Sequence, residues 1–344
     1  MADLIKYVVG IDISKDSFDA CIGSIDTEQN IVILPSKKFK NTKEGFVELL
    51  KWSKSNQSQG SQIWFVMEAT GVYFENLAYH LSKKKQQLNI VLPTKMKHFK
   101  QSTEVKTKTD SIDAKILTRY GLERQLEVWK EPIEEMKEIR DLCREHSGLT
   151  AMSTEIKNQM HAKKSSYKAS TKTLKRLNDH LNFLEKQSTS IINEIKLKLD
   201  KMPEVKSKIE MIENSLKGVG FITLIKLVSE TDGFAFISNG NQLSSYAGLD
   251  VVESQSGNVS GKTKISTKGN SNIRKALYMS SLSVIRHTQR YKDFYQGLLI
   301  RNKEKMVGVV AVMRKLLLLI YTLWKKNEPF IDNYNFKLKE TIIL

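Results

Sequence analysis

One stretch of the chain restricts its fold more than any other, because from Ile133 to Met202 it contains no proline and a single glycine, Gly148. Apolar residues within it recur three and four positions apart, which is the spacing of one helix face. The residues with this spacing are Leu174, Leu177, Leu181, Leu184, Ile191, Ile192, Ile195 and Leu199. A single helix of that length would span on the order of 100 Å at about 1.5 Å per residue. We therefore predict two antiparallel helices with a turn in the serine-rich stretch 163–173.

This helical stretch divides the 344 residues into three predicted domains. Residues 1–130 carry mixed strand and helix signals, residues 131–203 form a helical coiled-coil arm, and residues 204–344 form a mainly helical C-terminal domain. The arm suits dimerisation or contact with nucleic acid, and an ordinary helical domain has equal weight as an interpretation. The predicted fold class is therefore α/β followed by α.

The first 130 residues show strand and helix signals in an order typical of the ribonuclease H-like fold. Short β-rich runs come first, separated by polar turns, at residues 7–13, 18–23 and 31–34. The later signals are helix, strand, helix, strand and helix, at residues 42–54, 63–67, 74–83, 89–92 and from about Asp110. The run 63–67 is apolar without alternation, which favours a central strand that is covered on both faces.

The charge balance indicates a polyanionic partner. Lys and Arg number 55 against 38 Asp and Glu, which gives a formal net charge of +17. An excess of this size is typical of proteins that bind nucleic acid, because cations that neutralise phosphates release condensed counterions. The alternative is a basic protein with no such partner.

Neither the cysteines nor the most apolar segment indicates secretion or a membrane. Cys21 and Cys143 are far apart and suit buried thiols in a reducing compartment. The apolar segment 306–324 contains Arg314 and Lys315 in its middle, which predicts a buried helix and not a membrane-spanning one. The N-terminus does not resemble a signal peptide. We therefore expect a cytoplasmic protein without a membrane partner.

Two apolar strands each end at a carboxylate. Asp12 interrupts the apolar run that begins at Val8, and Glu68 ends the run 63–67 and precedes a turn. Burying an isolated carboxylate is costly unless a cation or hydrogen-bond donors compensate for it. Taken alone, Asp12 is more simply explained as a strand-end residue. Together with Glu68 it predicts two carboxylates at one edge of a sheet.

A second pair of carboxylates begins a predicted helix. Asp110 and Asp113 are three positions apart, so they face the same way on a helix. Thr109 or Asp110 is a candidate N-cap, and the helix dipole favours acids in the first turn, so this pair alone has a structural explanation. Taken together, the four carboxylates could hold two hard cations through oxygen ligands and stabilise the oxygens around a reacting phosphorus atom.

The clearest nucleic-acid signal lies in the C-terminal part of the chain. Residues 254–292 contain no Asp or Glu, and glycines and small polar residues fill the first half. The basic residues in this stretch are Lys262, Lys264, Lys268, Arg274, Lys275, Arg286, Arg290 and Lys292. Such a loop can approach a phosphate backbone while its lysines neutralise it. Lys106 and Lys108 place further cations just before Asp110, although a solvated basic loop would also explain them.

A Ser–Gly pair occurs twice in the acid-free loop, at Ser256 and at Ser260. Most such pairs are simple turns. A hydroxyl held beside metal ions and cations is also a candidate nucleophile at phosphorus. The residues themselves do not separate Ser256 from Ser260.

Four ordered motifs resemble the DEDD transposases of bacterial insertion sequences, the family that includes the bridge-RNA-guided recombinases and the Piv-type DNA invertases. The motifs are Gly10-Ile11-Asp12-Ile13-Ser14-Lys15, Glu68-Ala69-Thr70-Gly71, Lys108-Thr109-Asp110-Ser111-Ile112-Asp113-Ala114, and Ala247-Gly248-Leu249 through Ser256-Gly257 to Lys268-Gly269-Asn270. The resemblance covers nearly the whole chain. It departs from the family pattern near Asp250-Val251, where a proline is common, and at Gln255, where His or Ser is common.

The resemblance implies a RuvC-like nuclease domain of RNase H fold at 1–130 and a transposase domain with a catalytic serine at 204–344. The first would bind Mg²⁺, as two ions that Mn²⁺ can replace, through Asp12, Glu68, Asp110 and Asp113. Counting without gaps between the flanking motifs makes Ser256 the catalytic serine, which in this family would form a covalent phosphoserine link to DNA. The residues that we expect to contact nucleic acid are Lys106, Lys108, Gly257, Lys262, Lys264, Lys268, Arg274 and Lys275.

The resemblance also implies partners. They are double-stranded DNA, as donor and as target, and a structured bridge RNA encoded by the element, which pairs with both. One chain could not cut four strands, so we expect at least a homodimer, and a tetramer on DNA.

Three other classes of protein share part of this pattern. A RuvC-like junction nuclease would use the same acids for hydrolysis, with Ser256 only contacting phosphate. A sugar kinase or actin-like ATPase needs a glycine-rich phosphate turn after the first Asp, which residues 14–17 do not supply. A nucleic-acid-binding protein without chemistry would not account for carboxylates that end two apolar strands.

Overall fold

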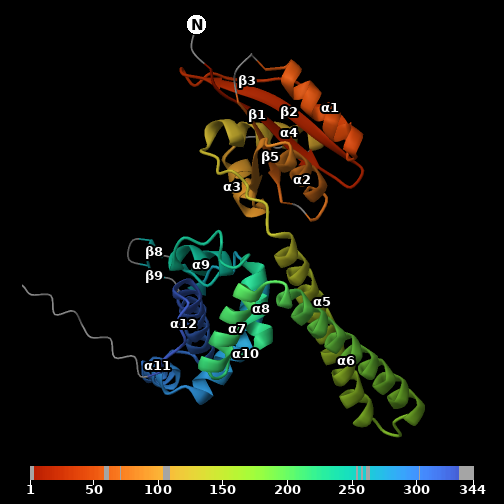
Figure 1. Cartoon of the computed structure of the whole chain (residues 1–344), viewed down its shortest axis with the longest axis vertical. Coiled ribbons are helices and arrows are strands. Elements are labelled where there is room, and N and C mark those ends of the chain that lie inside the picture. Colours follow the sequence, from red (N-terminus) through yellow and green to blue (C-terminus); the bar gives the residue numbers. More distant parts are fainter. Residues whose placement is uncertain are drawn as a thin grey trace, which may run out of the picture. The chain divides into compact units, whose positions relative to one another are not determined.

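The computed structural model describes residues 4–57, 62–69, 71–103, 109–252, 255–256, 259–260, 264–301 and 303–332. The chain folds as two compact units, Met1–Glu131 and Pro132–Leu344. The first unit contains a mixed sheet with helices, and the second is mostly helical (Figure 1). This order of an α/β part and a helical part agrees with the prediction from the sequence.

A mixed sheet forms the centre of the first unit. Its strands are β1 (Leu4–Ile13), β2 (Ser17–Asp26), β3 (Ile31–Ile33), β4 (Lys37–Lys40), β5 (Ile63–Glu68) and β6 (Gln87–Val91). The strands follow the order β3-β2-β1-β5-β6, and β4 also pairs with β2. The first strands pair antiparallel, whereas β1, β5 and β6 are parallel to one another.

Helices cover both faces of this sheet. They are α1 (Lys43–Ser55), α2 (Glu75–Lys83), α3 (Pro93–Ser102) and α4 (Asp110–Glu123). Successive residues of a strand point to opposite faces, and β1 follows this rule. Val9 and Ile11 are buried in one core with residues of α1 and α2, and Val8 is buried in another with residues of α3 and α4. We call the second side of the sheet the α4 face.

Two elements of the first unit differ from the sequence-based prediction. Strand β4 was not predicted because Phe39 is its single apolar residue, flanked by lysines, which is typical of an edge strand. The sequence signals assign no element to residues 93–102, but they form helix α3, which has Pro93 in its first turn. The buried residues Met96 and Phe99 hold α3 against the sheet.

The second unit begins with the predicted pair of long helices, α5 (Glu134–Lys164) and α6 (Thr171–Asp200). The Nζ atom of Lys198, near the end of α6, lies 2.7 Å from Oε2 of Glu138, near the start of α5, so the two helices are antiparallel. We refer to this pair as the arm. Apolar residues pack the start of α5 and the end of α6 into the core of the second unit; they are Met136, Ile139, Cys143, Ile191, Ile195 and Leu199.

The rest of the second unit is a helical domain with a small β element. Its helices are α7 (Pro203–Ser215), α8 (Phe221–Glu230), α9 (Gly240–Ala247), α10 (Ser271–His287), α11 (Gln289–Ile300) and α12 (Lys305–Lys326). By length and composition α12 could cross a membrane. However, Val312, Leu316 and Ile320 are buried in the core of the unit, which agrees with the buried helix that the sequence predicts.

Candidate functional site

Asp12 and Glu68 lie on neighbouring strands at the α4 face. The parallel register of β1 and β5 pairs Ile11 with Met67, so Asp12 and Glu68 follow in the same register. Gly10 of β1 and Val66 of β5 contact α4, so they lie on the α4 face. Asp12 and Glu68 each follow two positions later, and strand alternation places their side chains on the same face. The sheet therefore brings together the two carboxylates that the sequence places at the ends of apolar strands.

Helix α4 approaches the sheet closely because β1 has a glycine at the crossing point. A Cβ atom on Gly10 would lie 2.2 Å from the backbone nitrogen of Thr118 and 2.5 Å from the carbonyl oxygen of Ala114. The Gly10 amide donates to Oγ1 of Thr118 at 3.1 Å, and this hydroxyl lies 2.8 Å from the carbonyl oxygen of Cys21. This buried contact at Thr118 fixes α4 about two turns after its first residue, Asp110.

The start of α4 supplies the other two carboxylates. Thr109 is the N-cap, and its side chain accepts a hydrogen bond from the amide of Ile112. Asp110 is therefore the first helical residue and not the cap, and Asp113 lies one turn further on. Oδ1 of Asp113 lies 2.8 Å from Nζ of Lys100, which belongs to α3.

Electrostatic effects connect all four predicted acids. Burial, followed by the negative charges of Asp113 and Asp110, raises the pKa of Asp12 to about 6. Glu68 adds a smaller effect in the same direction, and the cation of Lys100 opposes it. The other three carboxylates are thus close enough to destabilise the charged form of Asp12. A divalent cation among them would reverse this effect.

The donor set fits a hard divalent cation, because carboxylate oxygens are the ligands that Mg²⁺ and Mn²⁺ prefer. In the described parts of the chain, however, no three His, Cys, Asp or Glu side chains are placed closely enough to bind one ion. Mg²⁺ is commonly held by one or two carboxylates together with substrate phosphates and water. The four acids therefore lie near one face of the sheet, where one or two of them could bind Mg²⁺ together with a phosphate and water.

A fifth carboxylate, which the sequence analysis did not single out, lies beside the others. Asp19 of β2 pairs directly with Asp12 across the antiparallel ladder. Burial raises its pKa, Lys38 at 4.0 Å opposes this, and Asp110 adds to the increase. The signal was available in the sequence, because Asp19 interrupts the apolar run of β2 as Asp12 interrupts that of β1.

The segment with the candidate serines forms short strands. They are β7 (Val251–Val252), β8 (Gln255–Ser256), β9 (Val259–Ser260) and β10 (Lys264–Ile265), and they pair as β7 with β10 and β8 with β9. Ser256 pairs with Val259, and Ser260 pairs with Gln255, so both serines belong to one hairpin. Among the predicted nucleic-acid contacts, Lys106, Lys108, Gly257 and Lys262 lie outside the described residues, and Lys264, Lys268 and Lys275 are exposed.

The residues that flank this segment, 246–248 and 269–270, contact each other, and we call this junction the loop base. The amide of Asn270 donates to the carbonyl oxygen of Tyr246 at 2.7 Å. A Cβ atom on Gly269 would lie 2.4 Å from the nitrogen of Gly248, so the backbones meet where a side chain would not fit. Nη1 of Arg274 donates to the carbonyl oxygens of Ala247 and Gly269. The predicted nucleic-acid contact Arg274 thus bonds to the loop base.

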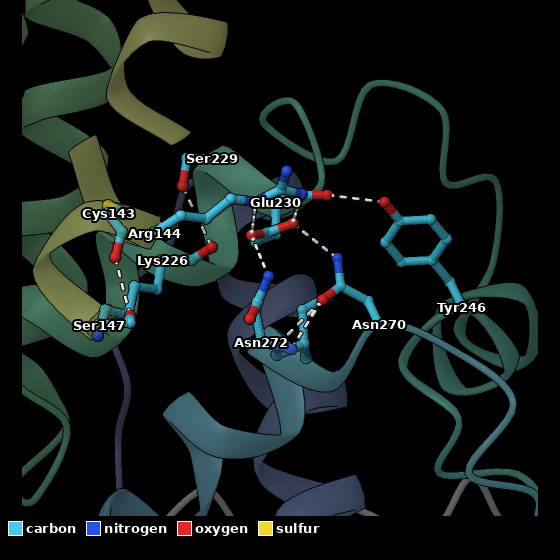
Figure 2. A network of polar contacts seen from close by, with 10 residues as sticks. Cys143, Arg144, Ser147, Lys226, Ser229, Glu230, Tyr246, Asn270 and Asn272 are labelled. Atoms are coloured by element: carbon cyan, nitrogen blue, oxygen red, sulfur yellow. Dashed lines mark hydrogen bonds and ion pairs between the residues drawn. The ribbon is translucent and has the colours of Figure 1, made fainter. Parts of the chain in front are cut away.

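A buried carboxylate connects the loop base to the arm (Figure 2). The side chain of Glu230, at the end of α8, is 2% exposed. Arg144 of α5 donates to both of its oxygens, at 2.8 and 2.9 Å. Asn270 and Asn272, at the start of α10, donate to the same carboxylate at 2.7 and 2.9 Å. Burial alone would raise the pKa of Glu230, but these bonds and the guanidinium hold the pKa below its usual value.

Replacing Arg144 by alanine is expected to destabilise the protein by about 3 kcal/mol, because it leaves a buried carboxylate without its cation. This is the lower end of the usual range, since the Arg144 side chain is half exposed. Denaturant unfolding of the full chain measures the change. The matched control is Arg119→Ala, which breaks an exposed pair with Glu123 and should cost less than about 0.5 kcal/mol. Equal losses in the two variants would contradict the role of burial.

Comparisons with known proteins match both the region with the four acids and the region with the two serines. A profile of DEDD transposases of IS110 type matches residues 9–168, which include the four acids. A second profile, described as the transposase IS116/IS110/IS902 family, matches residues 212–296, which include the two serines. Pilin gene-inverting proteins of Moraxella bovis and Moraxella lacunata are each 29% identical to the chain over 335 residues, which is 94% of this chain and 98% of theirs.

A solved structure of an Aquifex aeolicus member of the Ppx/GppA family also matches, with 11% identity over 27% of this chain and 37% of the other. Its TM-score of 0.21 is too low to support any inference about fold or function.

Proposed function

Because the chain belongs to the IS110/IS116/IS902 family of transposases, we propose that it cuts and rejoins DNA at Asp12, Glu68, Asp110 and Asp113, with Ser256 as the nucleophile. The family consists of DNA recombinases and implies the use of divalent metal. The observation that carries the proposal is the convergence of the four carboxylates, from β1, β5 and α4, on one face of the sheet.

The order of the strands supports an RNase H-like, RuvC-like assignment for the first domain. An antiparallel meander, β3-β2-β1, is continued by the parallel strands β5 and β6, as in that fold. We propose the same domains as the sequence indicates, namely 1–130, 131–203 and 204–344. The division of the chain into compact units after Glu131 is consistent with the first of these boundaries.

In the proposed reaction, the hydroxyl oxygen of Ser256 forms a bond to phosphorus while the bond from phosphorus to one strand oxygen breaks. The hydroxyl proton leaves with the departing oxygen, so charge and atoms balance. The phosphoserine retains the bond energy, and the hydroxyl of a second strand can reverse the step without ATP. Mg²⁺, as two ions, or Mn²⁺ in its place, would supply positive charge to the oxygens around phosphorus. The carboxylates of Asp12, Glu68, Asp110 and Asp113 would hold this charge in position.

We also propose the partners that the family resemblance implies. Donor and target DNA duplexes suit the net charge of +17. A structured bridge RNA would select their sequences. Four strands must be cut for a complete exchange, which requires at least a dimer and, on DNA, a tetramer.

The test is a reaction of the full chain with Mg²⁺, target and donor duplexes, and RNA transcribed from the DNA beside the gene. We expect a covalent protein–DNA adduct that survives denaturation, together with rejoined strands. Chelation of the metal by EDTA should abolish the adduct and leave DNA binding largely unchanged, because phosphate contacts by Lys and Arg need no metal. Adduct formation without added RNA would remove RNA guidance from the proposal.

A second candidate function is hydrolysis by a RuvC-like junction nuclease. The cluster of acids favours it equally, because the same ligands could serve a water molecule as the nucleophile. Its product would be hydrolysed ends, with no protein attached. Finding such ends without an adduct would replace the proposed function by this one.

A further inference from the structure

The distal end of the arm carries charge of one sign. Residues 156–178 comprise the last turns of α5, the connecting turn and the first turns of α6. This stretch contains no Asp or Glu. Its cations, all exposed, are Lys157, Lys163, Lys164, Lys168, Lys172, Lys175 and Arg176. We call residues 156–178 the arm tip.

The two ends of the arm differ in how their cations are neutralised. Near the base, Lys198 lies 2.7 Å from Glu138 and 3.9 Å from Glu194. At the arm tip, which is described throughout, Lys157 lies 3.5 Å from Glu185. The other six tip cations have no carboxylate within ion-pair distance in the described chain. An ordinary solvated helix face mixes both signs, whereas uncompensated like charges on a helix destabilise it. Because a bound polyanion would remove this repulsion between the lysines, the uncompensated charge indicates a polyanionic partner.

The turn at the arm tip also presents an aromatic ring to solvent. The side chain of Tyr167 is 90% exposed. Nζ of Lys168 lies 5.3 Å from the centre of its ring, and Lys168 has a left-handed backbone, with φ of 52°. An exposed ring among cations is the arrangement that stacks on an unpaired base while the cations neutralise the backbone.

The arm tip is separated from the core of its own unit. At the base of the arm, α8 packs against α5 and α7 packs against α6. Arg144 of α5 also donates a hydrogen bond to Glu230 there. Lys164 lies twenty residues after Arg144 on the same helix, about 30 Å along its axis. Beyond the base, Ile156 and Leu184 are the arm's buried residues, and neither belongs to the core of the second unit. The tip is thus a projection whose surface is available to a ligand.

We propose that the arm tip is a second nucleic-acid contact, in which the lysines hold a phosphate backbone and Tyr167 stacks on an unpaired base. The contact would bind the polyanion without taking part in the chemistry at Asp12. This proposal rests on the proposed function in one respect: both require that the chain binds nucleic acid.

The first test measures the affinity of the full chain in EDTA, so that no strand is cut, for a DNA duplex and separately for an RNA hairpin with an unpaired loop. The variant replaces Lys163, Lys164 and Lys168 by Gln. Each lost phosphate contact lowers the slope of log K against log salt by about 0.9 on a duplex. Loss of two phosphate contacts among these three lysines should therefore lower the slope by about 1.8. The affinity for the duplex should fall about 60-fold at roughly 0.1 M salt.

The matched control replaces Lys43, Lys51 and Lys54, three exposed lysines of α1, by Gln, which changes the net charge by the same amount. It should leave the slope within about 0.5 of the wild-type value, because a contact removed would change the slope by about 0.9. A change for DNA, for RNA or for both supports the proposal and identifies the ligand. Unchanged affinity and slope for both probes, or equal losses in the control, would overturn it.

The second test addresses the aromatic ring. Tyr167→Ala should weaken binding to the RNA hairpin about fivefold or more, whereas Tyr167→Phe, which keeps the stacking surface, should bind as the wild type does. Equal binding by all three proteins would overturn the stacking part of the proposal. These affinities are measured without chemistry, so absence of the covalent adduct would refute the proposed reaction and leave the arm-tip result standing.

Discussion

Replacing Asp12 by asparagine is expected to lower the rate of DNA strand transfer by about 10³-fold or more. Asparagine keeps the size of the side chain and one oxygen ligand but removes the charge at the centre of the acidic cluster. Positive charge held at a phosphorus centre contributes several kcal/mol to stabilising the transition state, and about 1.4 kcal/mol corresponds to a tenfold change in rate. Single-turnover strand transfer at saturating Mg²⁺ measures the effect.

Measuring the free energy of unfolding of Asp12→Asn distinguishes a loss of catalysis from a loss of folding. The folded-state pKa of Asp12 is raised to about 6 from an ordinary value of 3.8, so the folded protein binds this proton more tightly than the unfolded chain. The charged carboxylate therefore reduces stability as pH rises from about 4 to about 6. In EDTA at neutral pH, Asp12→Asn should be at least as stable as the wild type, and the difference should disappear below about pH 4.

The control for Asp12 is Asp26→Asn, which makes the same change at the last residue of β2, where the carboxylate accepts hydrogen bonds from Glu28 and Asn30. It should retain strand transfer within about twofold, because Asp26 lies seven residues along β2 from Asp19, which pairs with Asp12, and asparagine keeps an oxygen that can accept the hydrogen bonds. An Asp12→Asn variant that recombines at the wild-type rate would remove this residue from the catalytic machinery.

Replacing Ser256 by alanine is expected to abolish the covalent protein–DNA adduct, whereas Ser260→Ala should still form it. Without the hydroxyl oxygen no phosphoserine can form, so the effect should be complete rather than partial. The two serines occupy successive rungs of the β8–β9 ladder, which gives them different positions within one hairpin. Denaturing gels with labelled DNA measure the adduct, and anisotropy measures binding.

The two serine variants serve as controls for each other, because each removes one hydroxyl from the same hairpin. Both should bind DNA as the wild type does, since neither changes the charge. Loss of the adduct in Ser260→Ala, with retention in Ser256→Ala, would transfer the nucleophile to Ser260. Loss in both with normal binding would point to a role for the hairpin as a whole.

Much of the first unit could be predicted because its signals are local. The apolar run 63–67 ends at Glu68, and β5 ends at the same residue. Short or strongly charged elements were missed: β4 has only Phe39 as an apolar residue, and α3 carries basic residues on its exposed side. Periodicity also could not show the close approach of α4 to Gly10, which depends on residues 108 positions apart.

The network of Glu230 is harder to predict from the sequence. Its partners Arg144, Asn270 and Asn272 are 86, 40 and 42 positions away, and each is an ordinary polar residue in its local sequence. The two motifs around the serines, at Ala247-Gly248-Leu249 and Lys268-Gly269-Asn270, were recognised by resemblance to the family. The structure gives them a physical reason, because they form the loop base.

The loop base has a consequence for how the serine-bearing segment can change. The two ends of the segment meet at Gly248 and Gly269, and β7 pairs with β10 just inside them, so the positions at which the chain leaves and re-enters the domain are fixed. Doubling the length of a flexible loop costs only about 0.6 kcal/mol in closure entropy. Leu249 and Ile265 pack in the core of the second unit, so only the part of the segment beyond the β7–β10 pair could be replaced by segments of other lengths without repacking the helices.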